Sequence, residues 1–569
     1  MGARLVRMKP TVSLKISGAV LGLVAMGCTS DLSVQGPSEF EQSARPEQVV
    51  SASSKTGLTI EALRNKNTVG WFAYARSRYS YRLQTETAPA LATSDADPAT
   101  AIVADTDQVD LAAPTPELET AGAAPAMVAD AGVNDLGSGA GSGSVAAETG
   151  TFAGGFIEPT TSTQVRSRLT RAQLQALVPP AGGKFTFPGP YGTEAVRLTD
   201  ASSCGGSGDC VRYVGYSYWR NMNNHVGQNT MLILLGLDQR LGGAGLSLFR
   251  YHKDTDQLEA LGPIFGGTSI NSNLTGEGIY FSGTRPSIVY VAQGAQLLRF
   301  DVMTKTSEVV FDAASTYGAG TYLWQHHSSD DDLVHSASLR VSDTGAMLGC
   351  LLYREDTAAF RLFAAEGDFD ECQVDRSGDW LVIKDNIDGQ NGEDNRIINT
   401  NTMAETDLFD EQGAAGHSDL GHGVLVAEDN WNNLPGAVRA WPLGQSSLVG
   451  RIVYHDPAWR TEGSSHISHT NARRGVALED EIVCQSTVAR SAVTRGSEIF
   501  CYRLDGSLDV MVVAPVMTDL DAAGGGDDYA KAPKGNLDVT GRYFIWTSNA
   551  GSDRLDAFLV KVPSLLGQN

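Results

Sequence analysis

The chain has 569 residues and a formal net charge of −23, with 66 acidic against 43 basic side chains. This excess of negative charge argues against binding nucleic acid through its phosphates, and the sequence offers no polybasic patch for an anionic membrane surface. Only about the last 400 residues carry enough large apolar side chains to bury a core, so we expect one folded domain and a monomer.

The N-terminus has the order of an export signal. Basic residues between Arg4 and Lys15 flank an apolar run from Ile16 to Met26, which is followed by Gly27 and Cys28. The run is shorter than the ~20 residues that span a bilayer. The stretch before Cys28 resembles a bacterial lipobox, in which the cysteine is acylated, although Ala25 stands where that family prefers Leu. We expect a lipoprotein-type signal peptide over 1–28 and export to the bacterial periplasm or cell surface, with a lipid on Cys28 as the only membrane anchor; a plain signal peptide is the alternative.

Residues 29–165 have the composition of an acidic tether. Lys and Arg are absent from Leu83 to Val165, and the tract from Gly137 to Gly143 has almost no side chain to bury. Such a segment cannot offset its ordering entropy by apolar burial, so it is predicted to be disordered. Thr170 and Gln173 have the capping-box spacing, which predicts a short helix before Pro179 at the entrance to the folded domain, residues 166–569.

Export accounts for the cysteines. Apart from Cys28 there are six, and an even number in an oxidising compartment indicates disulfides. Six cysteines allow 15 pairings. Local pairing is preferred here: Cys204 with Cys210, Cys350 with Cys372, and Cys484 with Cys501.

From Phe185 onward, short β-rich runs are separated by Gly, Asp, Asn and Pro turns. Units of about 40 to 50 residues recur, each with a polar start, a short strand, a turn and a very apolar strand. The clearest are Gln373–Ile383 and Asn536–Trp546. This pattern predicts an all-β fold, a β-propeller. Units begin near 212, 276, 335, 371, 417, 466 and 536, and the last would be completed by a strand at Glu194–Thr199. Seven blades are expected, with six or eight as alternatives.

The blade sequences carry a family resemblance. Gly378-Asp379-Trp380 and Gly541-Arg542-Tyr543, each leading into an apolar strand, resemble blades of seven-bladed propellers of the TolB and oligogalacturonate-lyase type over most of 185–566. The resemblance to oligogalacturonate lyase implies a metal held by channel histidines and removal of a proton next to a uronate carboxylate. That family's metal motif does not align residue by residue here, so no role is carried over.

Histidines gather at or near the starts of the expected inner strands. Because inner strands converge on one channel, residues distant in sequence can meet there, and neutral imidazole suits Zn, Mn or Fe. The candidate ligands are His335, His417, His422, His466, His469 and Glu371. His466 and His469 should face opposite sides of a regular strand, which favours His469 as the ligand. The alternative is that these imidazoles form hydrogen bonds between blades. His326 and His327 are expected on an exposed loop.

Other candidate sites are less specific. Two acidic, Gly-rich loops can supply oxygen ligands for calcium, or can be ordinary turns; their carboxylates are Asp388, Asp394, Asp519, Asp521 and Asp527. Aromatic and amide side chains at the propeller face can bind a ligand such as a sugar, or fill the gaps between blades: Asn536, Trp324 and Trp431, with Tyr216, Tyr218 and Trp219.

Two functions follow from these features. The first is an exported, lipid-anchored propeller that binds a glycan, peptide or envelope protein. The second is a metal-dependent, lyase-like enzyme acting on polysaccharide at a His-lined channel, with Lys384, Lys531 or Lys534 available as a base. The missing motifs of familiar hydrolases favour the first.

Overall fold

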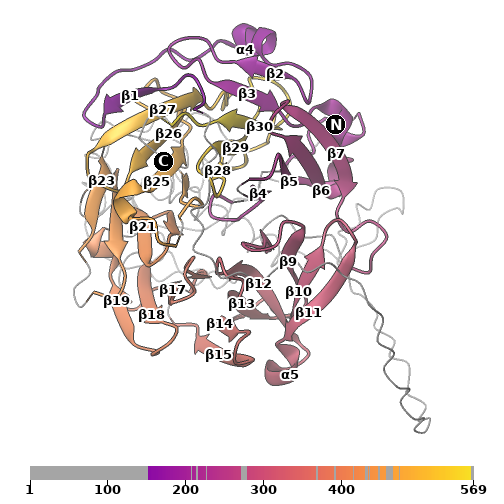
Figure 1. Ribbon diagram of the computed structural model, residues 1–569, viewed down its shortest axis with the longest axis vertical. Helices are drawn as coiled ribbons and strands as arrows, with labels where there is room; N and C mark the ends of the chain where they lie inside the picture. The colour runs from indigo at the N-terminus through magenta and orange to yellow at the C-terminus, as the bar shows by residue number, and fades with distance from the viewer. Residues whose placement is uncertain are drawn as a thin grey trace, which may run out of the picture.

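The computed structural model describes residues 151–564 except 207, 213–215, 226, 271–277, 367–368, 390–392, 414–415, 430–433, 435, 446–448, 456–465 and 473. Within these residues, seven antiparallel sheets are arranged around one axis (Figure 1). The fold is therefore a seven-bladed β-propeller, as the spacing of the strand runs predicts.

Six blades follow one another along the chain, each with its first strand innermost. Blade 1 comprises β4 (Met222–Asn223), β5 (Thr230–Leu237), β6 (Gly245–His252) and β7 (Gln257–Pro263). Blade 2 comprises β8 (Ile279–Phe281), β9 (Ile288–Gln293), β10 (Gln296–Asp301) and β11 (Thr306–Asp312). Blade 3 comprises β12 (Thr321–Ser328), β13 (Val334–Val341), β14 (Met347–Arg354) and β15 (Ala359–Ala364).

The next three blades repeat this order. Blade 4 comprises β16 (Cys372–Val374), β17 (Trp380–Asp385), β18 (Asp394–Asn399) and β19 (Glu405–Leu408). Blade 5 comprises β20 (Ser418–Leu420), β21 (Val424–Asp429), β22 (Ala437–Pro442) and β23 (Arg451–His455). Blade 6 comprises β24 (His466–Ser468), β25 (Ile482–Ser486), β26 (Glu498–Arg503) and β27 (Asp509–Pro515).

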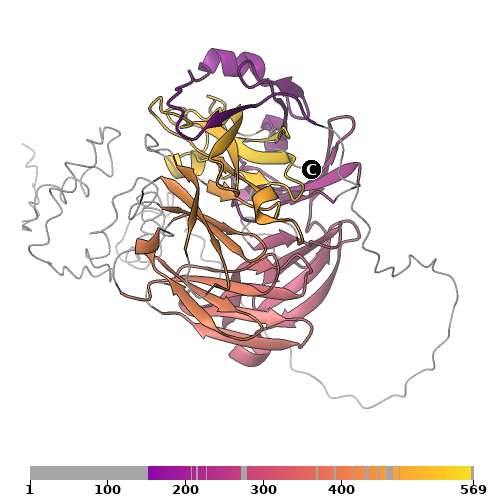
Figure 2. The ribbon, with the colours of Figure 1, turned by 60° about the vertical axis from the view of Figure 1, so that its left-hand side comes forward.

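The two ends of the described chain close the ring in blade 7. Its strands are β28 (Asn536–Leu537), β29 (Tyr543–Ser548), β30 (Asp556–Lys561), β3 (Glu194–Arg197) and β2 (Lys184–Thr186). The predicted closing strand is thus confirmed: β3 pairs with β30, with Ala195 opposite Val560. Figures 1 and 2 show the early strands beside the last ones. This pairing removes a sheet edge that would otherwise be open.

The segment before blade 7 also packs on the ring. β1 (Phe156–Pro159) adds a fifth strand to blade 6 by pairing with β27, although the sequence assigned these residues to the tether. The carboxylate of Glu158 on β1 is 2.9 Å from Arg166. The predicted helix is α4 (Arg171–Leu177), with a capping box at Thr170.

The remaining helical elements are short. They are α5 (Ala314–Tyr317), α6 (Asp528–Lys531), and the 3₁₀ turns η4 (Ala201–Cys204), η5 (Gln239–Leu241), η6 (Asp410–Gln412) and η7 (Leu478–Asp480). Among the described residues, none of the helices has the length and apolar character needed to cross a bilayer.

Blade 3 begins earlier than expected. The sequence placed its start near 335, but the innermost strand is β12, and His335 lies on the second strand, β13. The expected exposed loop at His326 and His327 is wrong, because both are buried on β12. A bulge between Trp324 and His327, with Gln325 at φ 50°, breaks the alternation that would reveal a strand.

All three predicted disulfides are confirmed. Cys204–Cys210 closes a loop before blade 1, and Cys484–Cys501 joins β25 to β26. Cys350–Cys372 connects β14 to β16 and so joins blade 3 to blade 4. Three buried disulfides are consistent with an oxidising compartment and hence with export.

Apolar side chains fill the spaces between adjacent blades. Between blades 7 and 1, for example, Ile545 and Leu559 pack with Met231 and Ile233, all of them buried. Burial of this kind stabilises the ring by about 1.5–3 kcal/mol for each large side chain. The starts of the seven inner strands are thereby held around one channel.

Candidate functional site

The chain leading into β4 crosses the mouth of this channel. Residues 216–221, the crossing segment, enter from blade 1 and contact blades on the opposite side. The hydroxyl of Tyr218 donates to Oε2 of Glu371 in front of blade 4, at 2.5 Å. The amide of Asn536, the first residue of β28, donates to the carbonyl of Ser217 at 2.9 Å. The crossing segment is therefore held by both blade 4 and blade 7.

Aromatic packing explains why this stretch lies inside the ring. Tyr218 and Trp219 are buried and form a cluster with Tyr280 of β8. The indole of Trp219 lies 5.0 Å from the imidazole of His327, between ring centroids. Large aromatic rings gain more from burial than short polar residues do, so the Tyr-Ser-Tyr-Trp sequence favours a position in the channel over one in solvent.

Two of the predicted histidines meet at this mouth. His417 precedes β20, His466 begins β24, and their rings stack with centroids 4.4 Å apart. The ring of Tyr216 contacts His466 edge-on at 4.8 Å, and its hydroxyl lies 3.1 Å from Nε2 of His417. The structure thus brings together one residue from each of blades 1, 5 and 6.

Glu371, predicted as a metal ligand, lies in front of β16 and holds a buried lysine. Nζ of Lys384 lies 2.8 Å from its Oε1. Burial lowers the pKa of Lys384, but the charges of Glu371, Glu393 and Asp370 together outweigh this and raise the pKa above its usual value. Lys384 is therefore a charged partner of Glu371, and a poor candidate for the base that the sequence offered.

The other two candidate bases, Lys531 and Lys534, also contact groups of the protein. Lys531 donates to the carbonyl of Leu520 at 2.7 Å. The ammonium of Lys534 lies over the ring of Tyr529, 4.0 Å from the centroid.

His422 lies at the far end of β20, away from the mouth. Its Nε2 is 3.0 Å from Asp330, whose other carboxylate oxygen binds Arg220 of the crossing segment. Burial raises the pKa of Asp330, but Arg220 and His422 outweigh it and lower that pKa to about 2. His422 therefore belongs to an ion network between blades 3 and 5.

His469 connects blades 5 and 6. It is completely buried after β24, and its Nε2 is 2.7 Å from Glu481. Its backbone N–H donates to the carboxylate of Asp419 on β20 at 2.6 Å. Burial raises the pKa of Asp419.

His335 and His326 pack between blades 2 and 3. Nδ1 of His335 is 2.8 Å from the hydroxyl of Ser328, and its Nε2 is 2.9 Å from Glu355. Nδ1 of His326 donates to the carbonyl of Gly278 at 3.0 Å, and burial lowers the pKa of His326 to about 3. The six predicted metal ligands thus fall into separate contacts around the ring, with only His417 and His466 side by side.

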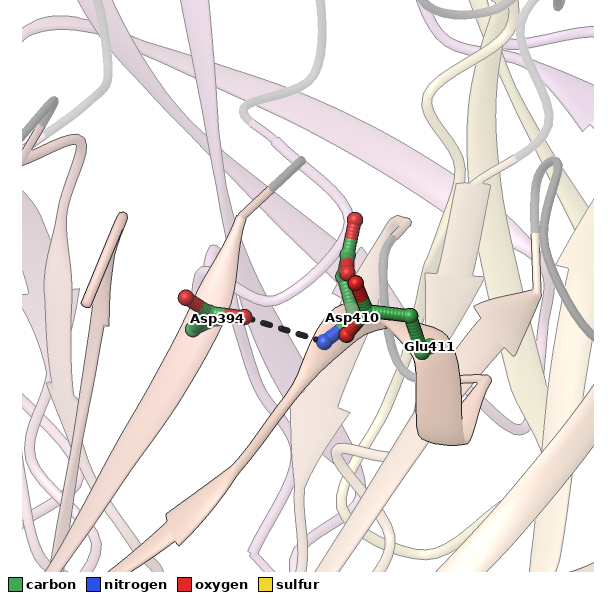
Figure 3. Close-up of side chains that lie close together, drawn as sticks. All are labelled: Asp394, Asp410 and Glu411. Carbon is green, nitrogen blue, oxygen red and sulfur yellow. Dashed lines mark hydrogen bonds between the residues drawn. The ribbon is translucent and has the colours of Figure 1, made fainter. Parts of the chain in front are cut away.

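One acidic group in the described part of the chain can hold a metal. Ligand atoms of Asp394, Asp410 and Glu411 all lie within 4.8 Å of one another (Figure 3). Asp394, a predicted calcium ligand, begins β18, and its carboxylate accepts backbone N–H groups from Asp410 at 3.0 Å and Ile387 at 2.8 Å. Asp388, expected to share the cation, contributes its backbone N–H to the same carboxylate.

The second acidic loop is held by arginines. Asp519 lies 3.1 Å from Arg171 of α4, while Asp521 pairs with Arg490. Asp527 is the N-cap of α6 and accepts the N–H of Ala530 at 2.8 Å. These carboxylates therefore face guanidinium and backbone N–H groups.

Three predicted residues are left to place: Trp324, Trp431 and Cys28. The ring of Trp324, on β12, is covered by Arg340 at 5.1 Å. Cys28 and Trp431 lie outside the described residues. Tyr529 of α6, which the sequence did not single out, joins the mouth: its hydroxyl donates to that of Tyr216 at 3.2 Å. No local pattern marks Tyr529, because α6 belongs to the link between blades 6 and 7.

Comparisons with known proteins find likenesses among solved structures but not among sequences. No protein-family model matches the chain, and no curated protein matches its sequence. Oligogalacturonate lyase from Vibrio parahaemolyticus is similar in structure, with 11% identity over 67% of this chain and 99% of that one and a TM-score of 0.47. An oligogalacturonate lyase in complex with manganese is 12% identical over 68% of this chain and 100% of that one, with a TM-score of 0.46.

TolB from Acinetobacter baumannii is a more distant likeness, with 9% identity over 59% of this chain and 80% of that one and a TM-score of 0.29. At such identities the likeness concerns the fold alone. The chain therefore resembles the TolB and oligogalacturonate-lyase propellers at the level of architecture, as its blade sequences indicated.

Proposed function

We propose that this protein is an exported, lipid-anchored β-propeller that binds a glycan at the cell envelope through the mouth of its channel. One observation carries the proposal: Tyr216, Tyr529 and His417, from three different parts of the chain, form one cluster of partly exposed aromatic and imidazole groups. Sugars bind such surfaces because their apolar faces stack on rings while their hydroxyls exchange hydrogen bonds with phenol and imidazole.

The charge of the protein indicates which glycan to test. With a formal net charge of −23, the chain repels polyanions at low salt. Neutral oligosaccharides are therefore the preferred ligands, and a peptide or an envelope protein is the alternative outcome.

The metal-dependent enzyme receives less support from the contacts. His335, His422 and His469 each face a carboxylate, at 2.9, 3.0 and 2.7 Å respectively. Only the His422–Asp330 pair joins two blades, because His335–Glu355 lies within blade 3 and His469–Glu481 lies within blade 6. Contacts between blades are the structural role considered for these imidazoles from the sequence. Binding of Zn, Mn or Fe by the channel histidines stays a prediction.

The binding proposal is tested with oligosaccharides derived from dextran, chitin and cellulose. We expect calorimetric titration of the full chain to detect binding of at least one of these oligosaccharides. Tyr529→Ala should weaken the affinity for that oligosaccharide about tenfold, as expected for an aromatic residue that anchors an interface. Tyr322→Ala, near the start of β12 in blade 3, is the matched control and should bind normally. Absence of binding to all three, or equal affinity in Tyr529→Ala, would refute the proposal.

A further inference from the structure

Three side chains at the channel mouth contact one another in series. The hydroxyl of Tyr216 lies 3.1 Å from Nε2 of His417, and Nδ1 of the same imidazole lies 3.7 Å from Oε2 of Glu428. They come from the crossing segment, from the residue before β20, and from β21. The imidazole therefore lies between a phenol and a carboxylate.

The surroundings define the direction in which protons can move. Glu428 is buried, and its other oxygen accepts a hydrogen bond from the amide of Gln485 on β25. At 3.7 Å the carboxylate is beyond hydrogen-bond length from Nδ1, but its negative charge still favours the tautomer that carries the proton on that nitrogen. Nε2 then presents its lone pair to Tyr216, so the phenolic hydrogen points at a base.

Exposure is lowest at the inner end of the series. The side chain of Glu428 is 1% exposed and that of His417 is 17% exposed, while Tyr216 is half-buried. His466 stacks on His417 and Tyr529 donates to Tyr216, so both outer groups are held in place. The ammonium of Lys534 lies over the ring of Tyr529, 4.0 Å from its centroid.

We propose that Tyr216, His417 and Glu428 form a proton relay that makes Tyr216 a general base toward a hydroxylated ligand at the channel mouth. The ligand gives one proton to Oη of Tyr216 while the phenolic proton moves to Nε2 of His417. The imidazolium that forms is stabilised by the carboxylate of Glu428, and reversal of both transfers returns the proton to the ligand. Tyr216 is the catalytic residue, and His417 and Glu428 are positioning residues that act through it.

This inference goes beyond glycan binding, and it is tested with N-acetylimidazole, a reagent that is not a sugar. The phenolic oxygen attacks the acetyl carbon as the proton of Tyr216 passes to His417, and the bond from acetyl to imidazole breaks. The departing imidazolide takes a proton from water, and His417 gives its proton to the hydroxide that this leaves. Mass spectrometry of peptides from the full chain then gives the acetylation rate of each tyrosine. Failure of glycan binding would leave this experiment unaffected.

We expect Tyr216 to be acetylated at least about tenfold faster near neutral pH than Tyr322, which is also half-buried, a gain at the low end of general-base catalysis. His417→Phe keeps a ring to stack on His466 but removes the proton acceptor, so it should reduce the Tyr216 rate to that of Tyr322. Glu428→Gln can keep its hydrogen bond with Gln485 and should give an intermediate rate. The pH profile of the Tyr216 rate should differ from that of the Tyr322 rate, a difference that a purely structural contact would not produce.

Equal rates for Tyr216 and Tyr322 in the wild-type protein would overturn the relay, as would a Tyr216 rate unchanged by both substitutions. If His417→Phe loses its folded circular dichroism signal, Glu428→Gln decides the matter. If neither variant folds, the pH profiles of the two tyrosines in the wild-type protein decide it.

Discussion

The burial of His326 predicts a specific loss of stability in weak acid. Burial lowers its pKa to about 3, with a further contribution from His335, whereas an unfolded chain binds a proton on histidine near pH 6.5. The neutral form is therefore preferred in the folded state. The neutral His326 therefore makes its full contribution to the free energy of unfolding above pH 6.5, and this contribution declines as the pH falls toward 3.

The size of the effect follows from these two values. At pH 5 the histidine is almost fully protonated in the unfolded chain but neutral in the folded protein. This difference lowers the free energy of unfolding by about 2 kcal/mol relative to pH 7.5. His327, next in sequence and also buried, has a lowered pKa and adds to the loss in the wild-type protein. A comparison with a variant is needed to isolate His326.

The variant is His326→Gln, whose amide can still donate to the carbonyl of Gly278 but does not titrate. We expect urea denaturation of the wild-type protein to lose about 2 kcal/mol more between pH 7.5 and 5 than that of the variant. His252→Gln, at a side chain that is 35% exposed on the outer surface, should follow the wild-type curve. Parallel curves for the wild-type protein and His326→Gln would refute the burial of this imidazole.

Three further outcomes are expected from single substitutions. Glu371→Ala leaves the ammonium of Lys384 buried without its carboxylate, so unfolding free energy should fall by about 3 kcal/mol; a fall under 1 kcal/mol in urea titrations would show that the pair is solvated. Cys372→Ser opens the bridge to Cys350 between blades 3 and 4 and should cost about 3 kcal/mol, seen as a lower melting temperature; a thermal scan that matches the wild type would contradict the pairing. Cys28→Ser should abolish incorporation of radioactive palmitate in a bacterial host, and retained label would exclude this cysteine as the lipid site.

The sequence was sufficient for the architecture because its signals are local and repeated. Turn residues between apolar strands recur at blade spacing, and the leftover strand before blade 1 could only pair with the incomplete last blade, as β3 and β30 do. The capping box at Thr170 and the short disulfide loops are local signals too. These features do not depend on knowing where other parts of the chain lie.

The mouth of the channel was only partly predictable for the opposite reason. Histidines at inner-strand starts indicated where side chains gather, and His417 and His466 do meet. Their contacts with Tyr216, 201 residues away from His417, depend on a segment that leaves its own blade to cross the channel. The bulge in β12 hid a strand because it interrupts the two-residue period on which strand prediction relies.

The position of the crossing segment is the claim on which the binding surface and the relay both depend. Nuclear Overhauser spectroscopy of the full chain with selectively labelled tyrosine and histidine measures it directly. The account predicts cross-peaks from the ring protons of Tyr216 to the imidazole protons of His466, whose ring centroids are 4.8 Å apart, and their loss in Tyr216→Ala. Cross-peaks from His466 to His417 without any to Tyr216 would place the segment outside the channel and contradict the account.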